Sequence, residues 1–404
     1  MLIKSLRITN LLSFGPEAES LPLGRLNVLI GPNGSGKSNF LEAISLLQAA
    51  PKDLSAPMKE VGGLRDWLWK GGSKAVAGLE VIVENPRGQM PLRHAMKFTE
   101  HGSRFELVEE RIEYERPFPG IGKTTPYFFY RFQNGYPVLN ESRDEEPRTP
   151  QGGTPPSQEA GAERELKRES LNPEQSILSQ VKDPERYPVL AYLEASYSRI
   201  AIYREWSFGR YTPPRQEQKA DLRTDSLMAT CENLALVLNK IRPRGRTRLL
   251  EALKALYPDI QDFNVQVEAG RVQLFLEESS FSIPATRLSD GTLRYLCLLA
   301  ILCHPDPPPL VCVEEPELGL HPDVLPELAR LLIDASDRTQ LVITTHSDIL
   351  VDAMTECPES VVVCEKHDGQ TEMRRLRKED LSEWLEKYRL GQLWTKGQLG
   401  GTRW

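Results

Sequence analysis

The residues with the clearest capacity for chemistry are those of the stretch GPNGSGKS, residues 31–38. A Gly, four residues and then Gly-Lys-Ser is the spacing of a phosphate-binding loop. Backbone N–H groups of such a tight loop point at phosphate oxygens, and glycines permit the close approach and the positive φ angles. We expect Lys37 to reach the β- and γ-phosphates of a nucleotide and the Ser38 hydroxyl to ligate Mg²⁺. The expected nucleotide-binding residues here are Gly31, Pro32, Asn33, Gly34, Ser35, Gly36, Lys37, Ser38 and Asn39.

The elements that must position this loop are present on both sides of it. Residues 26–30, LNVLI, are a short apolar run that predicts a buried strand. After the loop, Phe40, Leu41, Ile44 and Leu47 recur at helical spacing, and a helix start adds a positive dipole end. The alternative is a plain glycine turn between a strand and a helix, which the lysine and the full spacing disfavour.

An apolar strand that ends in two acids, LVCVEE, occupies residues 310–315. Such a strand delivers carboxylates to the edge of a parallel sheet, where ligands bind. We expect Glu314 to hold Mg²⁺, through a water, and Glu315 to polarise the water that attacks the γ-phosphate. Apolar strands that end in acids are common, and the phosphate loop earlier in the chain is what makes this one informative.

Two further polar turns follow the same pattern of strands and helices. Ser289 precedes a predicted helix, so it can be simply an N-cap, or it can bind a γ-phosphate together with the Gly291 amide. His346 follows the strand after Glu315, where a His can sense a phosphate oxygen or serve only as a polar strand end. The order of the motifs favours the functional interpretation of both residues.

Composition limits the class of protein. The chain has 404 residues, of which 40% are hydrophobic and 26% charged, and a net charge of −7. This net charge argues against a protein that coats nucleic acid through its overall charge, but it is compatible with a local basic groove. No apolar run is long enough to span a membrane and the N-terminus carries no signal peptide, so we expect a cytoplasmic protein. Six dispersed cysteines indicate buried thiols rather than zinc ligands.

The pattern along the chain predicts an α/β protein with several lobes. Alternation of strands and helices after residue 284 predicts a mostly parallel sheet, with strands at 310–314, 340–344, 360–365 and 371–375. A further strand is predicted at 200–206, and a hairpin of 263–267 and 271–277 around Ala269-Gly270. We predict two separate helices at 226–241 and 246–256, and a tail helix at 378–388, while the closing residues from Leu393 are left unplaced. The expected divisions are an N-terminal ATP-binding lobe with a β subdomain (1–140), a flexible linker (141–175), an inserted helical and mixed region (176–284), a C-terminal ATPase lobe (285–380) and a C-terminal helix and tail (381–404).

Two stretches have alternative interpretations that involve nucleic acid. The aromatic run at residues 127–130 can stack bases, although a strand packed on both faces explains it more simply. Four arginines between Arg242 and Arg248 can contact a phosphate backbone or can start a solvated helix, and we hold these two interpretations equal.

The order of the motifs resembles ABC-type ATPases of the SMC, RecF and OLD group, especially their stand-alone relatives without a coiled-coil arm. The matching stretches are ITNLLSFG at 8–15, the phosphate loop, LSDGT at 288–292, LVCVEEPE at 310–317, GLHP at 319–322 and TTHS at 344–347. The resemblance covers 1–48 and 285–350 tightly. It implies a P-loop head with a mixed β lobe, a parallel core sheet and an inserted helical region.

The resemblance also assigns roles. It implies that residues 31–38 are Walker A, 310–315 Walker B, 288–292 the signature motif and 318–322 the D-loop, with Glu315 as catalytic glutamate and His346 as switch histidine. It implies a homodimer that traps two Mg-ATP head to tail, so that Ser289 and Gly291 act on the other chain's phosphate. The chain departs from the pattern at Glu314, where Asp is usual, and at His321. The Q-loop glutamine is unassigned among Gln133, Gln175 and Gln180.

The function that follows is an ATPase that acts as a switch with DNA, or with a repair or phage-defence effector such as a nuclease or toxin. Roughly sixty residues after His346 leave no room for a nuclease domain, so that activity would come from a partner chain. The alternatives are a nucleotide-sensing scaffold with little turnover, which the Glu314 departure keeps open, and a transporter motor, which the EEPE and GLHP stretches disfavour.

Overall fold

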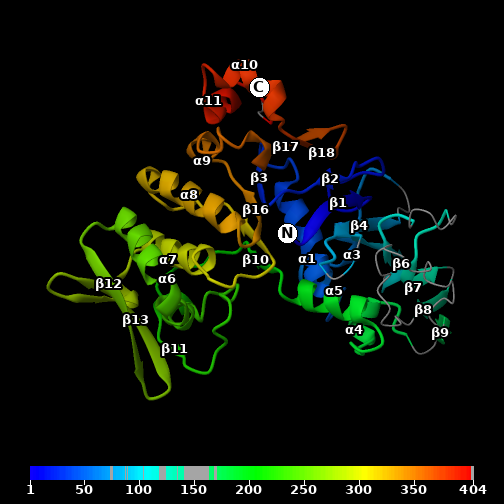
Figure 1. The fold of residues 1–404 in the computed structure, drawn as a ribbon, viewed down its shortest axis with the longest axis horizontal. Coiled ribbons are helices and arrows are strands. Elements are labelled where there is room, and N and C mark those ends of the chain that lie inside the picture. Colours follow the sequence, from blue (N-terminus) through cyan, green and yellow to red (C-terminus); the bar gives the residue numbers. More distant parts are fainter. Residues whose placement is uncertain are drawn as a thin grey trace, which may run out of the picture. The chain divides into compact units, whose positions relative to one another are not determined.

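A computed structural model gives the fold of the protein, which is drawn in Figure 1. The structure describes residues 1–72, 76–86, 88, 90–102, 104–117, 124–133, 135–140, 163–167 and 171–401. The chain divides into two compact units that are each discontinuous in sequence. Unit 1 comprises 1–23, 33–200 and 365–373, and unit 2 comprises 24–32, 201–364 and 374–404. The five divisions predicted from the sequence are continuous stretches of chain and are not tested by these two discontinuous units, so they remain a prediction.

Unit 2 is built on a parallel sheet. Its strands lie in the order β10 (Ala201–Tyr203), β15 (Leu310–Glu314), β16 (Gln340–Thr344), β3 (Leu26–Ile30) and β17 (Val361–His367), and the chain then turns into β18 (Gln370–Arg375). Neighbouring pairs from β10 to β17 are parallel. These strands are apolar runs without alternation because both faces of a parallel sheet are buried. Each predicted strand of this set is confirmed.

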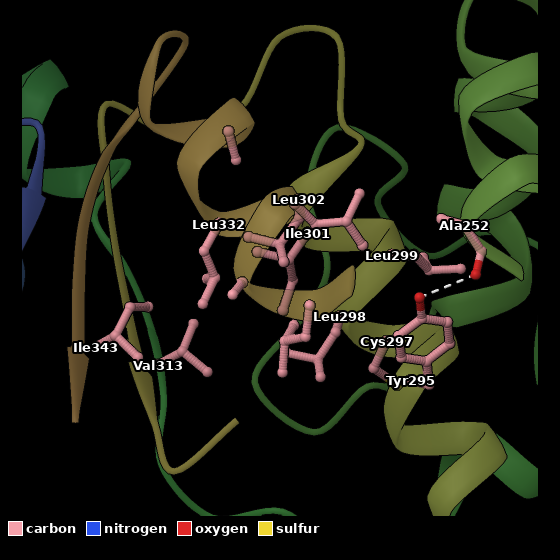
Figure 2. Close-up of a cluster of buried hydrophobic side chains, with 14 of the residues drawn as sticks. Ala252, Tyr295, Cys297, Leu298, Leu299, Ile301, Leu302, Val313, Leu332 and Ile343 are labelled. Carbon is pink, nitrogen blue, oxygen red and sulfur yellow. Dashed lines mark hydrogen bonds between the residues drawn. The ribbon is translucent and has the colours of Figure 1, made fainter. Parts of the chain in front are cut away.

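Helix α7 (Asp290–Leu302) lies at the centre of the unit 2 core. Figure 2 shows Leu298 and Ile301 on the side of the helix toward Val313 of β15, Ile343 of β16 and Leu332 of α8 (Leu325–Ser336). On the other side of α7, the Tyr295 hydroxyl donates a hydrogen bond of 2.9 Å to the Ala252 carbonyl of α6. Helix α7 is buried nearly all round, which explains its run of Leu, Ile, Cys and Ala.

The two helices predicted at 226–241 and 246–256 are wrong in both start and number. One helix, α6 (Leu234–Leu256), runs through Pro243 without a break. Its apolar face stays buried on both sides of the arginine run, and Arg242 and Arg246 each donate to Asp262 at 2.7 Å. Tertiary contacts therefore override the local breaking signals. The start is late because the Asn233 side chain holds the preceding residues in turns.

A hairpin of β12 (Ile260–Glu268) and β13 (Arg271–Glu278) packs against α6, and short strands β11 (Gln218–Lys219) and β14 (Ser282–Pro284) flank β13. The hairpin predicted around Ala269-Gly270 is confirmed, with positive φ at both turn residues. The remaining helices of unit 2 are α9 (Asp348–Asp352), α10 (Lys378–Leu385) and α11 (Leu390–Thr395), with one-turn helices at 213–215, 285–287, 322–324 and 358–360.

The closing stretch, which the sequence leaves unplaced, folds back within unit 2. Trp394 of α11 donates from its ring N–H to the Gly401 carbonyl at 3.2 Å. Arg374 donates to the Leu399 carbonyl at 2.9 Å. A Cβ atom at Gly401 would come within 3.4 Å of the Gly31 Cα atom, so the tail ends beside the first residue of the phosphate loop.

Unit 1 combines α1 (Lys37–Ala49) with an antiparallel sheet. The order is β2 (Leu21–Pro22), β1 (Ile3–Thr9), β4 (Ala77–Val83), β5 (Leu92–His101), β6 (Arg104–Tyr114), β7 (Phe128–Gln133), β8 (Tyr136–Asn140) and β9 (Glu163–Glu165). Its helices are α1, α2 (Ala56–Glu60), α3 (Leu64–Trp67), α4 (Ile177–Gln180) and α5 (Pro188–Ser198). Phe129 and Tyr130 are buried in β7, which supports the strand interpretation of the aromatic run. Of the predicted linker, residues 141–162 and 168–170 lie outside the described residues.

A buried carboxylate joins α4 to this sheet. Glu110 of β6 contacts His94 of β5 at 3.0 Å and accepts hydrogen bonds from the Ser176 hydroxyl and, at 2.9 Å, from the Ile177 amide. Glu110, His94 and Ser176 are all inaccessible to solvent. A buried carboxylate is tolerated only where hydrogen bonds replace its hydration, and here they do.

We predict that Glu110→Ala lowers the free energy of unfolding by about 3 kcal/mol, because three buried polar groups lose their partner. Urea denaturation measures this effect. Glu185→Ala, an exposed acid in the same unit, is the control and should change stability by less than about 0.5 kcal/mol. Equal, small effects of the two substitutions would contradict the anchoring role.

Candidate functional site

The carboxyl ends of three neighbouring strands meet at one edge of the unit 2 sheet. Strand register places Glu314 of β15 opposite Thr344 of β16, and Thr344 opposite Leu29 of β3. The Thr345 amide donates to the Leu29 carbonyl at 3.1 Å. The phosphate loop, the acidic pair and the histidine turn all begin at these strand ends. This is the edge at which open parallel sheets bind ligands.

The phosphate loop has the backbone that its glycines permit. Gly31, Gly34 and Gly36 have φ angles of 149°, 80° and 101°, and α1 begins at Lys37. A side chain at Gly36 would clash with Thr371 of unit 1, whose hydroxyl donates to the Ser35 carbonyl at 3.0 Å. The predicted strand, loop and helix are therefore all confirmed. Gly31 and Pro32 belong to unit 2, and 33–38 belong to unit 1.

Unit 1 braces its part of the loop from a second side. The Asn39 amide donates to the Ser13 hydroxyl at 2.8 Å, and the Thr371 hydroxyl contacts the same Ser13 oxygen at 2.6 Å. Asn39, predicted as a nucleotide-binding residue, thus also links α1 to the turn after β1.

Glu315 sits on a strained backbone that is held from both sides. Its φ of 45° is in the left-handed region, which costs a non-glycine residue about 1 kcal/mol. Its amide donates to the Thr344 carbonyl at 3.0 Å and hydroxyl at 3.2 Å, and its carbonyl accepts from Arg294 at 2.5 Å. Burial lowers the pKa of Arg294 to about 10, and nearby Glu317 and Glu315 act in the opposite direction. Arg294 is thus a buried, charged brace behind Glu315.

His346 lies beside the predicted catalytic carboxylate. Its Nε2 atom is 3.7 Å from the Glu315 Oε1 atom, and both side chains are 37% exposed. Glu317 holds the histidine turn, because its Oε1 atom accepts from the Thr345 hydroxyl at 2.6 Å and from the His346 amide at 2.9 Å. The structure therefore brings the two predicted catalytic residues of unit 2 together.

Glu314, the predicted metal ligand, is half-buried and forms an ion pair. Arg204, which follows β10, donates from Nε to the Glu314 Oε2 atom at 3.0 Å. The Trp206 ring N–H donates to the Glu314 carbonyl at 3.1 Å. The Arg204 guanidinium partly neutralises the charge of this carboxylate.

The signature turn and the D-loop lie against each other in unit 2. Ser289 is the N-cap of α7 and accepts from the Thr292 amide at 3.1 Å, so the capping role is confirmed. A Cβ atom at Gly291 would come within 2.7 Å of the Gly319 carbonyl oxygen, so only glycine fits there. Leu318 in the D-loop is 57% exposed. The phosphate contacts of Ser289 and Gly291 stay a prediction.

The residues present fit a magnesium nucleotide. The Ser35 hydroxyl is buried in the phosphate loop and has no hydrogen-bond partner among the described residues, and Lys37 is 6% exposed at the helix start. No cluster of three His, Cys, Asp or Glu side chains in the described ranges holds a metal by itself. Mg²⁺ in nucleotide sites is bound by one or two protein oxygens and substrate phosphates, so it needs no such cluster. Ser38 and Glu314 stay predicted ligands of Mg²⁺.

A pocket of about 550 Å³ opens in unit 1 beside α1. Asn39 and Glu42 of α1 line the pocket, together with Trp69 and Lys70. Ser13, which contacts Asn39, also lines the pocket. It therefore combines an aromatic ring, charged groups of both signs and residues bonded to the phosphate-loop helix.

Several sequence-based candidates stay open or weaken. The Gln175 amide is bonded to Asp53 and the Leu54 amide, Gln180 is bonded to Asn172 and the Gln175 carbonyl, and Gln133 is exposed, so none is assigned as the Q-loop residue. Of the arginine run, Arg242 and Arg246 pair with Asp262 and Arg248 pairs with Asp334 at 2.9 Å. These ion pairs favour the structural interpretation of that run. All six cysteines are free thiols, and five are buried.

Sequence reasoning missed the arginines that hold the acidic strand end. Arg204 and Arg294 lie 110 and 21 residues from the groups that they contact. Arg204 lies within the strand predicted at 200–206 and directly follows β10 in the structure, so the rule that parallel strands end at one edge could have flagged it. Nothing in the sequence identifies β10 as the neighbour of β15.

The fold is that of an SMC head, an ABC-type ATPase fold. A crystal structure of an SmcHead bound to the C-winged helix domain of ScpA is similar with a TM-score of 0.57 and 14% identity, covering 94% of this chain and 99% of that chain. The Smc head domain with an extended coiled coil, bound to the C-terminal domain of ScpA derived from Pyrococcus furiosus, has a TM-score of 0.56 and 14% identity, covering 96% and 99%. At this identity the likeness concerns the fold alone.

The chain belongs to the family described as "AAA domain, putative AbiEii toxin, Type IV TA system", which matches residues 26–352. The predicted resemblance and fold class are confirmed. No curated protein matches this sequence. The longest described helix is α6, with 23 residues, and no long coiled coil occurs in the described chain. Among the described helices none is long and apolar enough to cross a membrane.

Proposed function

We propose that the protein binds and hydrolyses ATP and works as a switch, in which two copies close head to tail around Mg-ATP and reopen after hydrolysis. The observation that carries this proposal is the common edge of β3, β15 and β16, where the phosphate loop, Glu314–Glu315 and His346 begin. Membership of an AAA family and an SMC-head fold support the same class of activity.

Each predicted residue has a role in the proposed reaction. Backbone amides of residues 31–38 and the Lys37 ammonium bind the phosphates, and Ser38 and Glu314 hold Mg²⁺, which when bound neutralises phosphate charge. Glu315 accepts a proton from the attacking water, and His346 at 3.7 Å from it hydrogen-bonds the γ-phosphate. Ser289 and the Gly291 amide at the start of α7 complete the site of the other copy.

The unit 1 pocket is proposed as the place of the nucleoside. It begins at Asn39 and Glu42, on the first two turns of the helix whose N-terminus receives the phosphates. Trp69 offers a ring for stacking on the base, and the Glu42 and Asp66 carboxylates can accept from amino or hydroxyl groups.

We predict that Trp69→Ala weakens ATP binding roughly tenfold, because stacking of a base on an aromatic ring contributes about 1–3 kcal/mol. Calorimetry of ATP and of inorganic tripolyphosphate measures the effect. Tripolyphosphate has no base, so its affinity should stay the same. Equal losses for both ligands would instead mean that the substitution damages the phosphate loop, and no loss would remove the pocket from the proposal.

The output of the switch is proposed to be DNA or an effector protein in repair or phage defence. Phosphate release by the isolated chain, with and without duplex or single-stranded DNA, tests both hydrolysis and coupling to DNA. ATP-dependent release is expected from the chain alone. Complete absence of release, with ATP bound, would contradict the proposed hydrolysis.

The second candidate is a nucleotide-sensing scaffold with little turnover that controls a partner enzyme. The ion pair between Arg204 and Glu314 favours it, because a guanidinium on the metal-binding carboxylate opposes a catalytic Mg²⁺. The same phosphate-release assay separates the two candidates, since the scaffold binds ATP without releasing phosphate.

A further inference from the structure

One segment of unit 2, residues 204–215, touches two of the functional motifs at its two ends. At the first end, Arg204 donates to the Glu314 carboxylate at 3.0 Å. At the second end, the buried Arg215 guanidinium donates to the Leu288 carbonyl and to the Asp290 carboxylate of the signature turn. The segment is therefore bonded to the Walker B strand and to the turn that carries Ser289.

Stacked side chains stiffen the first half of this segment. The Trp206 ring lies nearly parallel to Tyr203 and to Phe208, with centroids 6.0 Å and 5.8 Å away and interplanar angles of 23° and 21°. The Arg294 guanidinium lies over the Trp206 ring at 4.8 Å. Trp206 also donates to the Glu314 carbonyl. The Phe208 carbonyl accepts from Arg215 at 3.1 Å, which joins the stacked half to the second end.

Arg204 and a metal ion cannot both interact fully with the Glu314 carboxylate. The pair is only partly exposed, with 29% of the Arg204 side chain and 19% of the Glu314 side chain accessible. A divalent cation that approaches Glu314 is repelled by the guanidinium and competes for the same oxygens. Glu314 also has one more methylene group than the aspartate usual at this position.

We infer that Arg204 competes with Mg²⁺ for Glu314, and that the segment 204–215 transmits the outcome to the signature turn. This inference rests on the proposed function. Arg204 and Arg215 are positioning residues in it, since neither is assigned a contact with the nucleotide. Metal binding in a chain's own site then adjusts the Ser289 turn, which serves the other copy, so that the two sites of a dimer are linked through each chain.

The first test is the Mg²⁺ dependence of ATP binding. Dissociation constants for ATP are measured at a series of free Mg²⁺ concentrations in the Glu315→Gln background, which stops turnover. Arg204→Ala is expected to lower the Mg²⁺ concentration of half-maximal effect by about fivefold, the equivalent of a partly exposed ion pair. Arg204→Lys should keep the original value, because the charge remains.

Arg210→Ala is the matched control, since Arg210 is exposed on the same segment and lies against Tyr211. If Arg204 has only a structural role, Arg204→Ala should leave the Mg²⁺ concentration of half-maximal effect unchanged or raise it. Either result would overturn the competition. The sign of the change thus separates the two roles.

The second test follows the signature turn by hydrogen exchange of residues 286–293, with ATP present and Mg²⁺ added or omitted. A Ser289→Asp background removes the proposed dimer contact. Mg²⁺ is expected to change exchange of this turn when Arg204 is present and to leave it unchanged in Arg204→Ala. If hydrogen exchange of this turn does not change on addition of Mg²⁺ while Arg204 is present, the link is contradicted.

A chain that binds no ATP overturns the proposed function and this inference together. If the chain binds ATP but its Mg²⁺ titrations are the same with Arg204 and with Arg204→Ala, the inference alone is overturned.

Discussion

Glu315→Gln should slow ATP hydrolysis by roughly 10²- to 10⁴-fold while ATP remains bound. Glutamine has the same shape but cannot accept the proton of the attacking water. The backbone contacts that hold this residue at φ 45° come from Thr344 and Arg294 to main-chain atoms, so the substitution leaves them intact. The variant should therefore accumulate in its ATP-bound, dimeric form.

Phosphate release under single-turnover conditions, together with the mass of the particle in ATP, measures this prediction. Glu268→Gln is the control, because Glu268 is an exposed acid at the end of the β12 hairpin strand. An unchanged rate in Glu315→Gln would remove Glu315 as the general base.

Ser289→Asp should abolish ATP-dependent dimerisation while leaving the fold and monomeric ATP binding intact. Aspartate caps a helix about as well as serine, so the hydrogen bond to the Thr292 amide is retained. A carboxylate that faces the other copy's triphosphate is repelled, and like charges across an interface cost several kcal/mol. We expect dimer affinity in ATP to fall about 100-fold or more.

Sedimentation in ATP measures the dimer, and thermal unfolding measures the fold. Ser289→Ala tests the opposite case, because it removes the cap but adds no charge. If Ser289 serves only as a cap, Ser289→Ala destabilises by about 1 kcal/mol and Ser289→Asp does nothing. That pattern would contradict the role in dimer closure.

The parts of the fold that sequence predicted are those fixed by local patterns. The run LNVLI, three glycines and GKS specify a buried strand, a tight loop and a helix, and the structure contains β3, the loop and α1 at these residues. Strands 310–314 and 340–344 are predicted to the residue, since apolar runs between turns have sharp ends.

The parts that sequence did not predict depend on contacts between distant residues. Pro243, Gly245 and the arginines look like a helix boundary, but Asp262 on β12 pairs with Arg242 and Arg246 and the helix continues. The order of the strands in the sheet is likewise not determined by any single local segment of the sequence. It places Arg204 beside Glu314, a partner 110 residues away.

The candidate site follows the same division. The types and spacing of Lys37, Glu314, Glu315 and His346 predict them as site residues, because each lies at or shortly after the end of a predicted strand. Their roles stay a prediction. The backbone strain at Glu315 and the Arg294 brace behind it appear only when α7, β15 and β16 are assembled. The buried Ser35 hydroxyl without a partner is another feature that only the folded loop reveals.

The central claim, a shared site with Ser289 from one copy and Lys37 from the other, is tested most directly by mixing two inactive variants. Lys37→Ala lacks the phosphate-binding ammonium, and Ser289→Asp lacks a usable signature turn. In a head-to-tail heterodimer of the two, one site keeps both native residues. Each such heterodimer has one intact site of two, and neither variant closes with itself, so the mixture is expected to recover up to about half of the native phosphate release. If both residues served the same chain's nucleotide, the mixture would be as inactive as its components, and that result would contradict the account.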